Sequence, residues 1–356
     1  MPDARDPAAD LRTIAFLLER AREPTYRVRA FRTAAGVVDA LPADEVRSRA
    51  AAGTLKELAG IGDKTALCVT ESLAGTTPAY LARLQADEPD PLAEATAALR
   101  ALLRGDCHTH SDWSDGGSPI REMAETARAL GHEYVVLTDH SPRLTVANGL
   151  SVERLERQLE VVAELNEDFA SQASSDDARP FRILTGIEVD ILDDGTLDQQ
   201  PSLLSRLDVV VASVHSKLRM PAEEMTPRMI AAIANPHTDV LGHCTGRLIT
   251  GGRGQRPQSE FDAELVFAAC EAFGVAVEIN SRPERMDPPA DLLRLAVDAG
   301  CLFSIDTDAH APGQLDWQHN GCDKAVEADV PAERIVNTWA AAELVAWAAD
   351  HDVRPA

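Results

Sequence analysis

The sequence predicts a distorted seven-stranded (β/α)7 barrel preceded by a small all-α N-terminal domain. After residue 104, short β-rich runs alternate with longer helical stretches. Runs such as Val209-Val210-Val211 are apolar throughout, as strands buried on both faces must be, and the helices between them imply parallel crossovers. Before residue 90, apolar residues recur at helical spacing only. These observations favour an α/β barrel built from consecutive strand–helix units.

The N-terminal domain is expected to span residues 1–88. Leu11, Ile14 and Leu17 recur at helical spacing, and a second amphipathic run opens at Tyr26. The stretch Glu88-Pro89-Asp90-Pro91 cannot sustain a helix, because proline lacks an amide donor and restricts the residue before it. We therefore place the boundary there, followed by a linker helix within residues 89–103 and a second domain over residues 104–356.

The second domain contains seven candidate strands. They are Gly105 to His108, Tyr134 to Thr138, Arg182 to Glu188, Val209 to Val214, Val240 to His243, Val275 to Ile279 and Leu302 to Ile305. Helical stretches separate most of them, so the strands should pair in chain order.

Charge is distributed unevenly over the 356 residues. Residues 1–90 hold 12 basic and 14 acidic side chains, whereas residues 91–356 hold 22 and 44 and so carry nearly all of the net charge of -24. An evenly acidic surface would repel a nucleic-acid backbone. Residues 11–49, by contrast, hold 8 Arg against 5 Asp and Glu, a weak basic excess.

The chain shows no feature of a membrane or secreted protein. It has no apolar run near the roughly 18 residues that a membrane span needs and no basic-then-apolar leader. Its six cysteines form no CxxC pair. We therefore expect a cytoplasmic protein with reduced thiols and no membrane partner.

Side chains of the kind that bind metals sit at the ends of the candidate strands. They are His108, His110, Asp115, His140, Glu188, His215, His243, Asp308 and His310. A residue of this kind follows six of the seven strands, and barrel strands deliver their carboxyl ends to one rim. The i, i+2 spacing of His108 with His110, and of Asp308 with His310, places each pair on one side of an extended segment. The sequence therefore predicts a polynuclear metal site. The other histidines, His132, His237, His319 and His351, we assign to non-ligand roles.

The ordered motifs carry a family resemblance. They are His108-Thr109-His110-Ser111 with Asp115-Gly116, Thr138-Asp139-His140-Ser141, Thr185 to Asp190, Val214-His215-Ser216, Leu241 to Arg247, and Thr307-Asp308-Ala309-His310. This order closely resembles the polymerase and histidinol phosphatase (PHP) domain, in particular the one attached to bacterial family X DNA polymerases. The resemblance spans about residues 104–345. Cys244 stands where that family suggests Pro, a departure that leaves the candidate ligands in place.

The resemblance implies three divalent metal ions. His108, His110, Glu188 and Asp308 would hold the first. Glu188 would bridge to the second, held also by His215 and His243, and Asp115, His140 and His310 would hold the third. The histidines suit Zn²⁺ or Fe, whereas the carboxylates equally admit Mn²⁺.

The N-terminal domain resembles the same polymerases. The segment from Leu58 to Ala66 fits a helix-hairpin-helix in which Gly60 and Gly62 let backbone amides approach a DNA phosphate, with Lys64 beside them. An ordinary helix–helix connection is the alternative. The polymerase core is absent between the two domains. Cys68 stands where the family suggests a lyase lysine, so no amine is available there. We expect neither polymerase nor lyase activity.

The predicted chemistry is metal-dependent phosphoester hydrolysis. Glu188 and Asp308 would act through the metals, Arg247, Arg282 and Arg285 are candidate phosphate clamps, and Asp139 and Asp306 are candidates to orient ligand imidazoles or take up a proton.

Three hypotheses remain open at this point. The first is a phosphoesterase acting on DNA ends, as a 3′ to 5′ exonuclease or 3′-end phosphatase. The second is a small-molecule phosphatase similar to histidinol phosphatase, which the acidity of residues 91–356 favours. The third is a DNA-binding scaffold with a structural metal cluster.

Overall fold

The structure, a computed structural model, describes residues 5–87, 91–173, 180–251 and 254–350. The chain divides into two compact units, Met1–Pro91 and Leu92–Ala356. Of the proline-containing stretch where we expected the boundary, residues 88–90 lie outside the described part of the chain.

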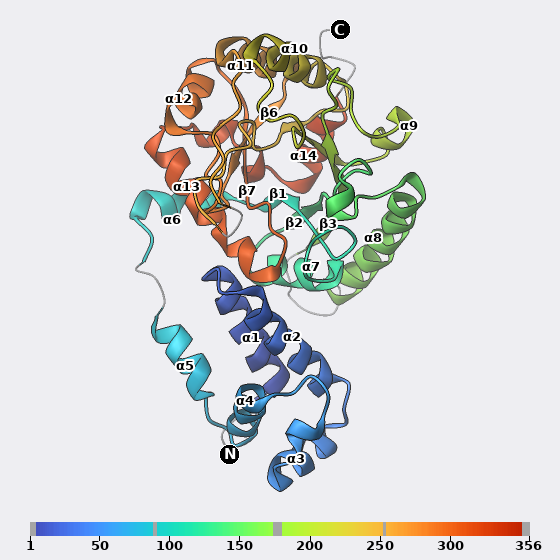
Figure 1. Ribbon diagram of the computed structural model, residues 1–356, viewed down its shortest axis with the longest axis vertical. Helices are drawn as coiled ribbons and strands as arrows, with labels where there is room; N and C mark the ends of the chain where they lie inside the picture. Colours follow the sequence, from blue (N-terminus) through green and yellow to red (C-terminus); the bar gives the residue numbers. More distant parts are fainter. Residues whose placement is uncertain (1–4, 88–90, 174–179, 252–253, 351–356) are drawn as a thin grey trace. The chain divides into compact units, whose positions relative to one another are not determined.

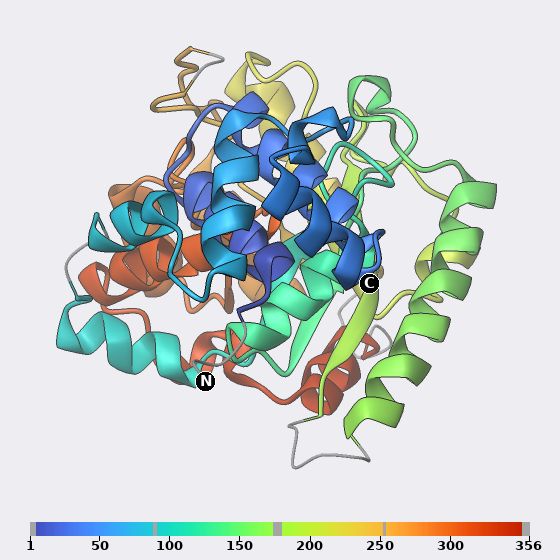
Figure 2. The same cartoon turned by 90° about the horizontal axis from the view of Figure 1, so that it is seen from below.

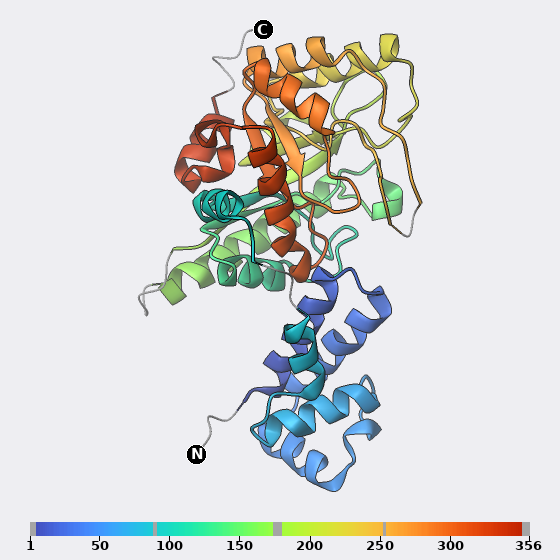
Figure 3. The same ribbon diagram turned by 90° about the vertical axis from the view of Figure 1, so that its left-hand side faces the viewer.

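The N-terminal unit consists of helices (Figure 3). They are α1 (Pro7–Arg20), α2 (Thr25–Asp39), α3 (Ala43–Ala52), the short 3-10 turn η1 (Leu55–Glu57), α4 (Asp63–Leu73) and α5 (Ala79–Ala86). The side chain of Asp6 caps α1 by accepting from the amide of Ala8, with Pro7 in the first turn. The buried face of α1, which includes Leu11 and Ile14, packs against α2 around Phe31. The predicted all-α domain is confirmed.

The C-terminal unit is built around a nearly closed parallel barrel (Figure 1). Its strands are β1 (Gly105–Thr109), β2 (Tyr134–Leu137), β3 (Arg182–Asp190), β4 (Val209–Ser213), β5 (Val240–Leu241), β6 (Ala276–Asn280) and β7 (Phe303–Asp306). They pair in chain order, with Gly186 opposite Val209 and Val277 opposite Phe303. The predicted seven-stranded barrel is confirmed, although β5 is only two residues long.

Helices surround the strands. They are α6 (Glu94–Leu102), α7 (Ile120–Ala129), α8 (Val152–Ala173), α9 (Pro201–Leu204), α10 (Ala222–Ile233), α11 (Ala263–Phe273), α12 (Ala290–Asp298), α13 (Gln318–Glu327) and α14 (Ala341–Ala348), with 3-10 turns η2 (Thr145–Ala147), η3 (Pro312–Trp317), η4 (Ala332–Arg334) and η5 (Val336–Thr338). The long amphipathic α8 lies along β3 (Figure 2). No helix within the described segments has the length and apolar character needed to cross a bilayer.

The barrel closes between β1 and β7 largely through side chains. Backbone contact there includes a parallel bridge between Thr109 and Ala309. The carboxylate of Asp106 accepts from the amide of Thr307, and that of Asp306 accepts from the amide of Cys107 at 2.7 Å. We call this region the seam.

Candidate metal centre

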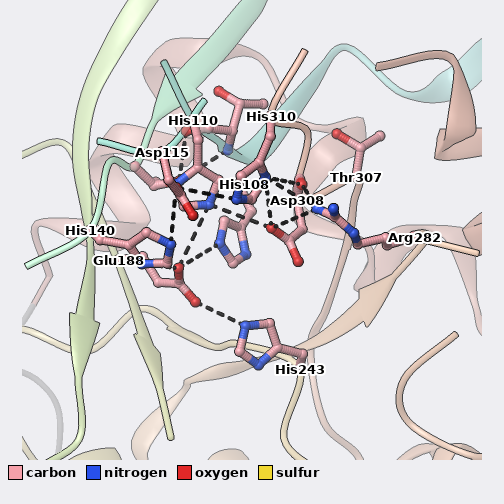
Figure 4. A network of polar contacts seen from close by, with 12 residues as sticks. His108, His110, Asp115, His140, Glu188, His243, Arg282, Thr307, Asp308 and His310 are labelled. Atoms are coloured by element: carbon pink, nitrogen blue, oxygen red, sulfur yellow. Dashed lines mark hydrogen bonds and ion pairs between the residues drawn. The ribbon is translucent and has the colours of Figure 1, made fainter. Parts of the chain in front are cut away.

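The candidate ligands converge at the carboxyl ends of the strands (Figure 4). Each side chain lies in a strand or in the loop that follows it, so residues from six strands share one rim. His108, His110, Glu188 and His243 are almost completely buried, whereas the side chain of Asp115 is 37% exposed. The centre is therefore a buried polar cluster that opens on the side of Asp115.

Glu188 lies at the middle of this cluster. Its Oε1 is 2.9 Å from Nε2 of His243 and 3.3 Å from Nε2 of His215. Its Oε2 is 2.8 Å from Nδ1 of His140 and 3.4 Å from Nε2 of His108. Because the two oxygens face different imidazoles, one carboxylate can serve two cations.

Three groups of side chains bring potential ligand atoms within 4.8 Å of one another. They are His108, His110 and Asp308; His140, Glu188 and His215; and His110, Asp115, His140 and His310. This grouping differs from the allocation implied by the family resemblance, because His110 and His140 each belong to two groups. His243 belongs to none of them but contacts Glu188 directly.

The donor atoms of the cluster fit divalent cations. Among the described residues, Nε2 of His108, both ring nitrogens of His110 and both carboxylate oxygens of Glu188 are buried without a hydrogen-bond partner. Buried polar atoms are normally satisfied, so such a concentration of unsatisfied nitrogen and oxygen atoms needs an explanation. Imidazole and carboxylate together are ligands for Zn²⁺, Mn²⁺ and Fe.

Burial and mutual charge shift the titration of these groups. Burial, with neighbouring His310 and His140, lowers the pKa of His110 to about 3. Burial lowers the pKa of His215, but Glu188 and Asp190 outweigh it and raise that pKa to about 9. Burial raises the pKa of Glu188, but the surrounding imidazoles outweigh it and hold that pKa well below its usual value. Glu188 is thus an anion at neutral pH.

Two carboxylates that the sequence analysis missed hold the imidazoles of candidate ligands. Oε1 of Glu278 lies 2.6 Å from Nδ1 of His108, and Oδ1 of Asp190 lies 2.6 Å from Nδ1 of His215. Such contacts fix the tautomer and ring orientation of a ligating histidine. The signals were present: Glu278 interrupts an apolar strand, and Asp190 follows Glu188 at i+2 on the same strand face.

The described hydrogen bonds of Asp139 and Asp306 include no imidazole, contrary to the expectation that they orient one, whereas their uptake of a proton stays a prediction. Asp139 accepts from the amide of Ser111 at 2.8 Å and from Gln158 at 2.7 Å, so it secures the loop after β1. Asp306 accepts from the amide of Cys107 and from Asn337, so it belongs to the seam. Asp139 points away from the imidazoles because it alternates with His140, which faces the cluster.

Arg282 and Arg285 support Asp308. Asp308 has φ +52°, a left-handed conformation that Asp tolerates better than most residues. Nη1 of Arg282 donates to its backbone oxygen at 2.9 Å, and Nε of Arg285 donates to Oδ2 at 3.1 Å. Burial raises the pKa of Asp308, but Arg282, His110 and Arg285 together outweigh it and hold that pKa well below its usual value.

Two donor atoms of Arg247, a candidate phosphate clamp, bind backbone oxygens. Its Nε donates to the backbone oxygen of Arg285 at 3.0 Å, and its Nη2 donates to that of Met286. These bonds tie the loop after β5 to the loop that carries Arg285. Arg282, which lies 3.1 Å from Nδ1 of His310, is the arginine nearer the candidate ligands.

The hairpin residues of the N-terminal unit lie on its surface. Gly60 has φ +94°, and a Cβ there would stand 2.8 Å from the side chain of Thr33. Gly62 precedes α4, and a Cβ there would meet nothing within 4 Å. The first-turn amides of α4 have no intrahelical acceptor, and Lys64 is exposed beside them.

A groove of about 460 Å³ runs beside this hairpin. Its lining includes Tyr26, Arg27, Gly60, Gly62, Lys64 and Tyr80. Nearby Cys68 is buried, and burial raises its pKa to about 11, so this position offers neither an amine nor a reactive thiolate.

The histidines assigned to other roles lie apart from the ligand groups. His132 is buried, with Nε2 2.9 Å from Nη2 of Arg100, and Nδ1 of His319 lies 2.5 Å from the backbone oxygen of Asp316. His237 is partly buried, and His351 lies outside the described residues.

Comparisons with known proteins agree with this architecture. The helix-hairpin-helix domain profile matches residues 3–77, and the PHP domain profile matches residues 106–282. The chain is 38% identical over 235 residues to the DNA polymerase/3′-5′ exonuclease PolX of Bacillus subtilis, an alignment covering 66% of this chain and 39% of that longer protein. It is 28% identical over 244 residues to a probable phosphatase of Thermoanaerobacter sp., covering 65% of this chain and 89% of that protein.

A solved structure was also found. The histidinol phosphate phosphatase of Lactococcus lactis, solved with zinc, L-histidinol and phosphate, aligns with a TM-score of 0.46 and 20% identity, over 63% of this chain and 92% of that one.

The two profile matches are separated by residues 78–105 alone, so no polymerase core lies between them. The chain is therefore a PHP domain protein with an N-terminal helix-hairpin-helix domain, similar to bacterial family X polymerases but without their polymerase core, and it belongs to the metal-dependent phosphoesterases.

Proposed function

We propose that this protein hydrolyses phosphoester bonds at DNA ends, as a 3′ to 5′ exonuclease or a 3′-end phosphatase, with three divalent cations of Zn, Mn or Fe. The observation that carries the proposal is the position of Glu188, whose two oxygens face separate imidazoles within a buried cluster of ligand atoms. The helix-hairpin-helix domain in the same chain favours DNA as the substrate.

Different residues of the chain would bind each of the three cations. His108, His110 and Asp308 would hold one cation, Glu188 would link it to a second beside His215 and His243, and Asp115, His140 and His310 would hold a third. Bound divalent cations supply Lewis acidity that neutralises phosphate charge and activates water. Arg282 lies at the edge of the cluster, where its remaining donors can contact a phosphate oxygen.

The N-terminal unit would hold the DNA strand. The amides that open α4 and the exposed Lys64 form an anion site of the kind found at helix N-termini, and Gly62 leaves the approach open. Tyr26, with 73% of its surface exposed, and Arg29 lie on the neighbouring helix α2 and offer a ring face and a cation to a nucleotide.

A small-molecule phosphomonoesterase similar to histidinol phosphatase is the second candidate. The net charge of -22 on residues 91–356 favours it, because that acidity opposes approach of a polyanionic strand.

The deciding experiment compares turnover of 3′-labelled single-stranded DNA with turnover of histidinol phosphate by the metal-loaded full chain. Shortening or 3′-dephosphorylation of the DNA, abolished by a chelator and restored by Mn²⁺ or Zn²⁺, would support the proposal. Turnover of histidinol phosphate alone would replace it with the second candidate, and DNA binding without either turnover would indicate a scaffold.

A further inference from the structure

Strand β6 is the strand that contributes no candidate ligand to the cluster. It contributes Glu278 and Asn280 instead, two residues apart and both fully buried. The i, i+2 spacing places both side chains on the same face of the strand. The other side chains of this strand, including Val277 and Ile279, belong to the hydrophobic core.

The carboxylate of Glu278 contacts candidate ligand residues from two other strands. Oε1 lies 2.6 Å from Nδ1 of His108, and Oε2 accepts from the backbone amide of His243. Asn280 extends this arrangement, since its Nδ2 is 3.2 Å from Oε2 of Glu278 and 3.5 Å from Oδ2 of Asp308. One buried carboxylate therefore fixes a side chain of β1 and a backbone segment that follows β5.

The contact with His108 determines which ring nitrogen is free. A carboxylate can only accept a hydrogen bond, so Nδ1 of His108 carries the proton. Nε2, which lies 3.4 Å from Oε2 of Glu188 and has no hydrogen-bond partner among the described residues, is then the nitrogen that can bind a cation. This is the tautomer that His108 needs to bind a cation held together with Glu188.

We propose that Glu278 is a positioning residue that sets the affinity of the His108, His110 and Asp308 group for its divalent cation. It does so by holding His108 in the Nδ1–H tautomer. The inference rests on the metal centre of the proposed function but not on the identity of the substrate.

The test measures metal binding rather than activity. Full-length protein, stripped of metal, is titrated with Zn²⁺ against a competing chelator, for the unmodified chain and for Glu278→Gln. Glutamine keeps an acceptor oxygen but loses the charge, so we expect one bound Zn²⁺ to lose about 10- to 100-fold in affinity while the remaining ions keep theirs. The matched control is Asp239→Asn, a buried carboxylate just before β5, at the strand ends opposite the candidate ligands, which accepts from the amide of Val210 at 2.8 Å. It should retain the affinities of the unmodified chain.

A second measurement keeps the inference testable if Glu278→Gln does not fold. Long-range proton–nitrogen correlation on the zinc-loaded unmodified protein should show His108 protonated at Nδ1. A proton at Nε2, or a folded Glu278→Gln protein with unchanged Zn²⁺ affinity, would overturn the inference. If the unmodified protein does not cleave DNA but Glu278→Gln clearly loses Zn²⁺ affinity, the proposed function alone would be overturned.

Discussion

Replacing Gly62 with valine should separate DNA binding from phosphoester hydrolysis. Gly62 has φ -102° and ψ -178°, an extended conformation open to valine, and the added Cβ meets nothing within 4 Å. The new side chain therefore occupies solvent in front of the amides of Asp63 and Lys64, where a phosphate would approach. The metal centre lies in the other unit and should be unaffected.

The size of the effect follows from the interaction that is blocked. Losing one hydrogen bond between an amide and a phosphate removes about 1.5–3 kcal/mol, which corresponds to a roughly 10- to 150-fold weaker Kd for single-stranded DNA. Valine is a poorer helix cap than glycine, at a cost of about 1 kcal/mol in the stability of the N-terminal unit. Binding should therefore fall while the unit stays folded.

The assay is fluorescence anisotropy with a labelled single-stranded oligonucleotide at fixed salt, run beside p-nitrophenyl phosphate hydrolysis by the same preparations. Gly36→Val is the matched control, because Gly36 is also exposed with nothing within 4 Å of an added Cβ, and it does not line the groove. Unchanged DNA affinity in Gly62→Val would refute the role of the hairpin. Equal loss of both activities would point to misfolding or a shared site.

Three further outcomes are expected. Glu188→Ala should be the most damaging single change, lowering metal content and reducing phosphoesterase turnover by more than the roughly 100-fold typical of losing an outer contact, as metal analysis and p-nitrophenyl phosphate assays would show. Burial and Arg100 lower the pKa of His132 to about 3, below its value of about 6.5 in the unfolded chain. The contribution of neutral His132 to the free energy of unfolding is therefore complete above pH 6.5 and is lost as the pH falls. At pH 5 this loss is roughly 2 kcal/mol, and His132→Gln should reduce the shift in urea midpoint between pH 7 and pH 5. Borohydride should trap no covalent adduct on a 5′ abasic DNA end, because Cys68 offers no amine, and an adduct on Lys64 would contradict our interpretation of this domain. Nucleotide incorporation should also be absent, because no polymerase core lies between the two matched domains.

Much of the barrel was predictable because its strands are short and apolar on both faces. Runs such as Val209–Ser213 cannot face water on either side, and the helices between them leave parallel pairing as the simple solution. The length of β5 was overestimated, because the strand ends at Leu241; at the next residue, Gly242, a Cβ would stand 2.2 Å from Oγ of Ser213. That close approach depends on the neighbouring strand and is not visible in the local sequence.

The candidate ligands were recognisable as polar residues at strand ends, whereas their supports were not. Asp139 and His140 are adjacent, so one of them must turn away from the cluster, and the local pattern does not say which. Glu278 lies inside a strand rather than at its end, and its partner His108 is 170 positions away. Contacts of that sequence separation follow from barrel closure, which a single sequence specifies only indirectly.

A cation bound at the seam between β1 and β7 would make metal content and barrel integrity interdependent. Candidate ligands flank it, with His108 and His110 on one side and Asp308 on the other, and Nε2 of His110 lies 3.5 Å from Oδ1 of Asp308. A cation shared by these residues would link the edges of β1 and β7, where hydrogen bonds to carboxylates add to a small number of backbone contacts. Chelation should then speed amide hydrogen exchange in β1 and β7 before it affects β3 and β4, so the first opening of the barrel would occur beside its reactive centre.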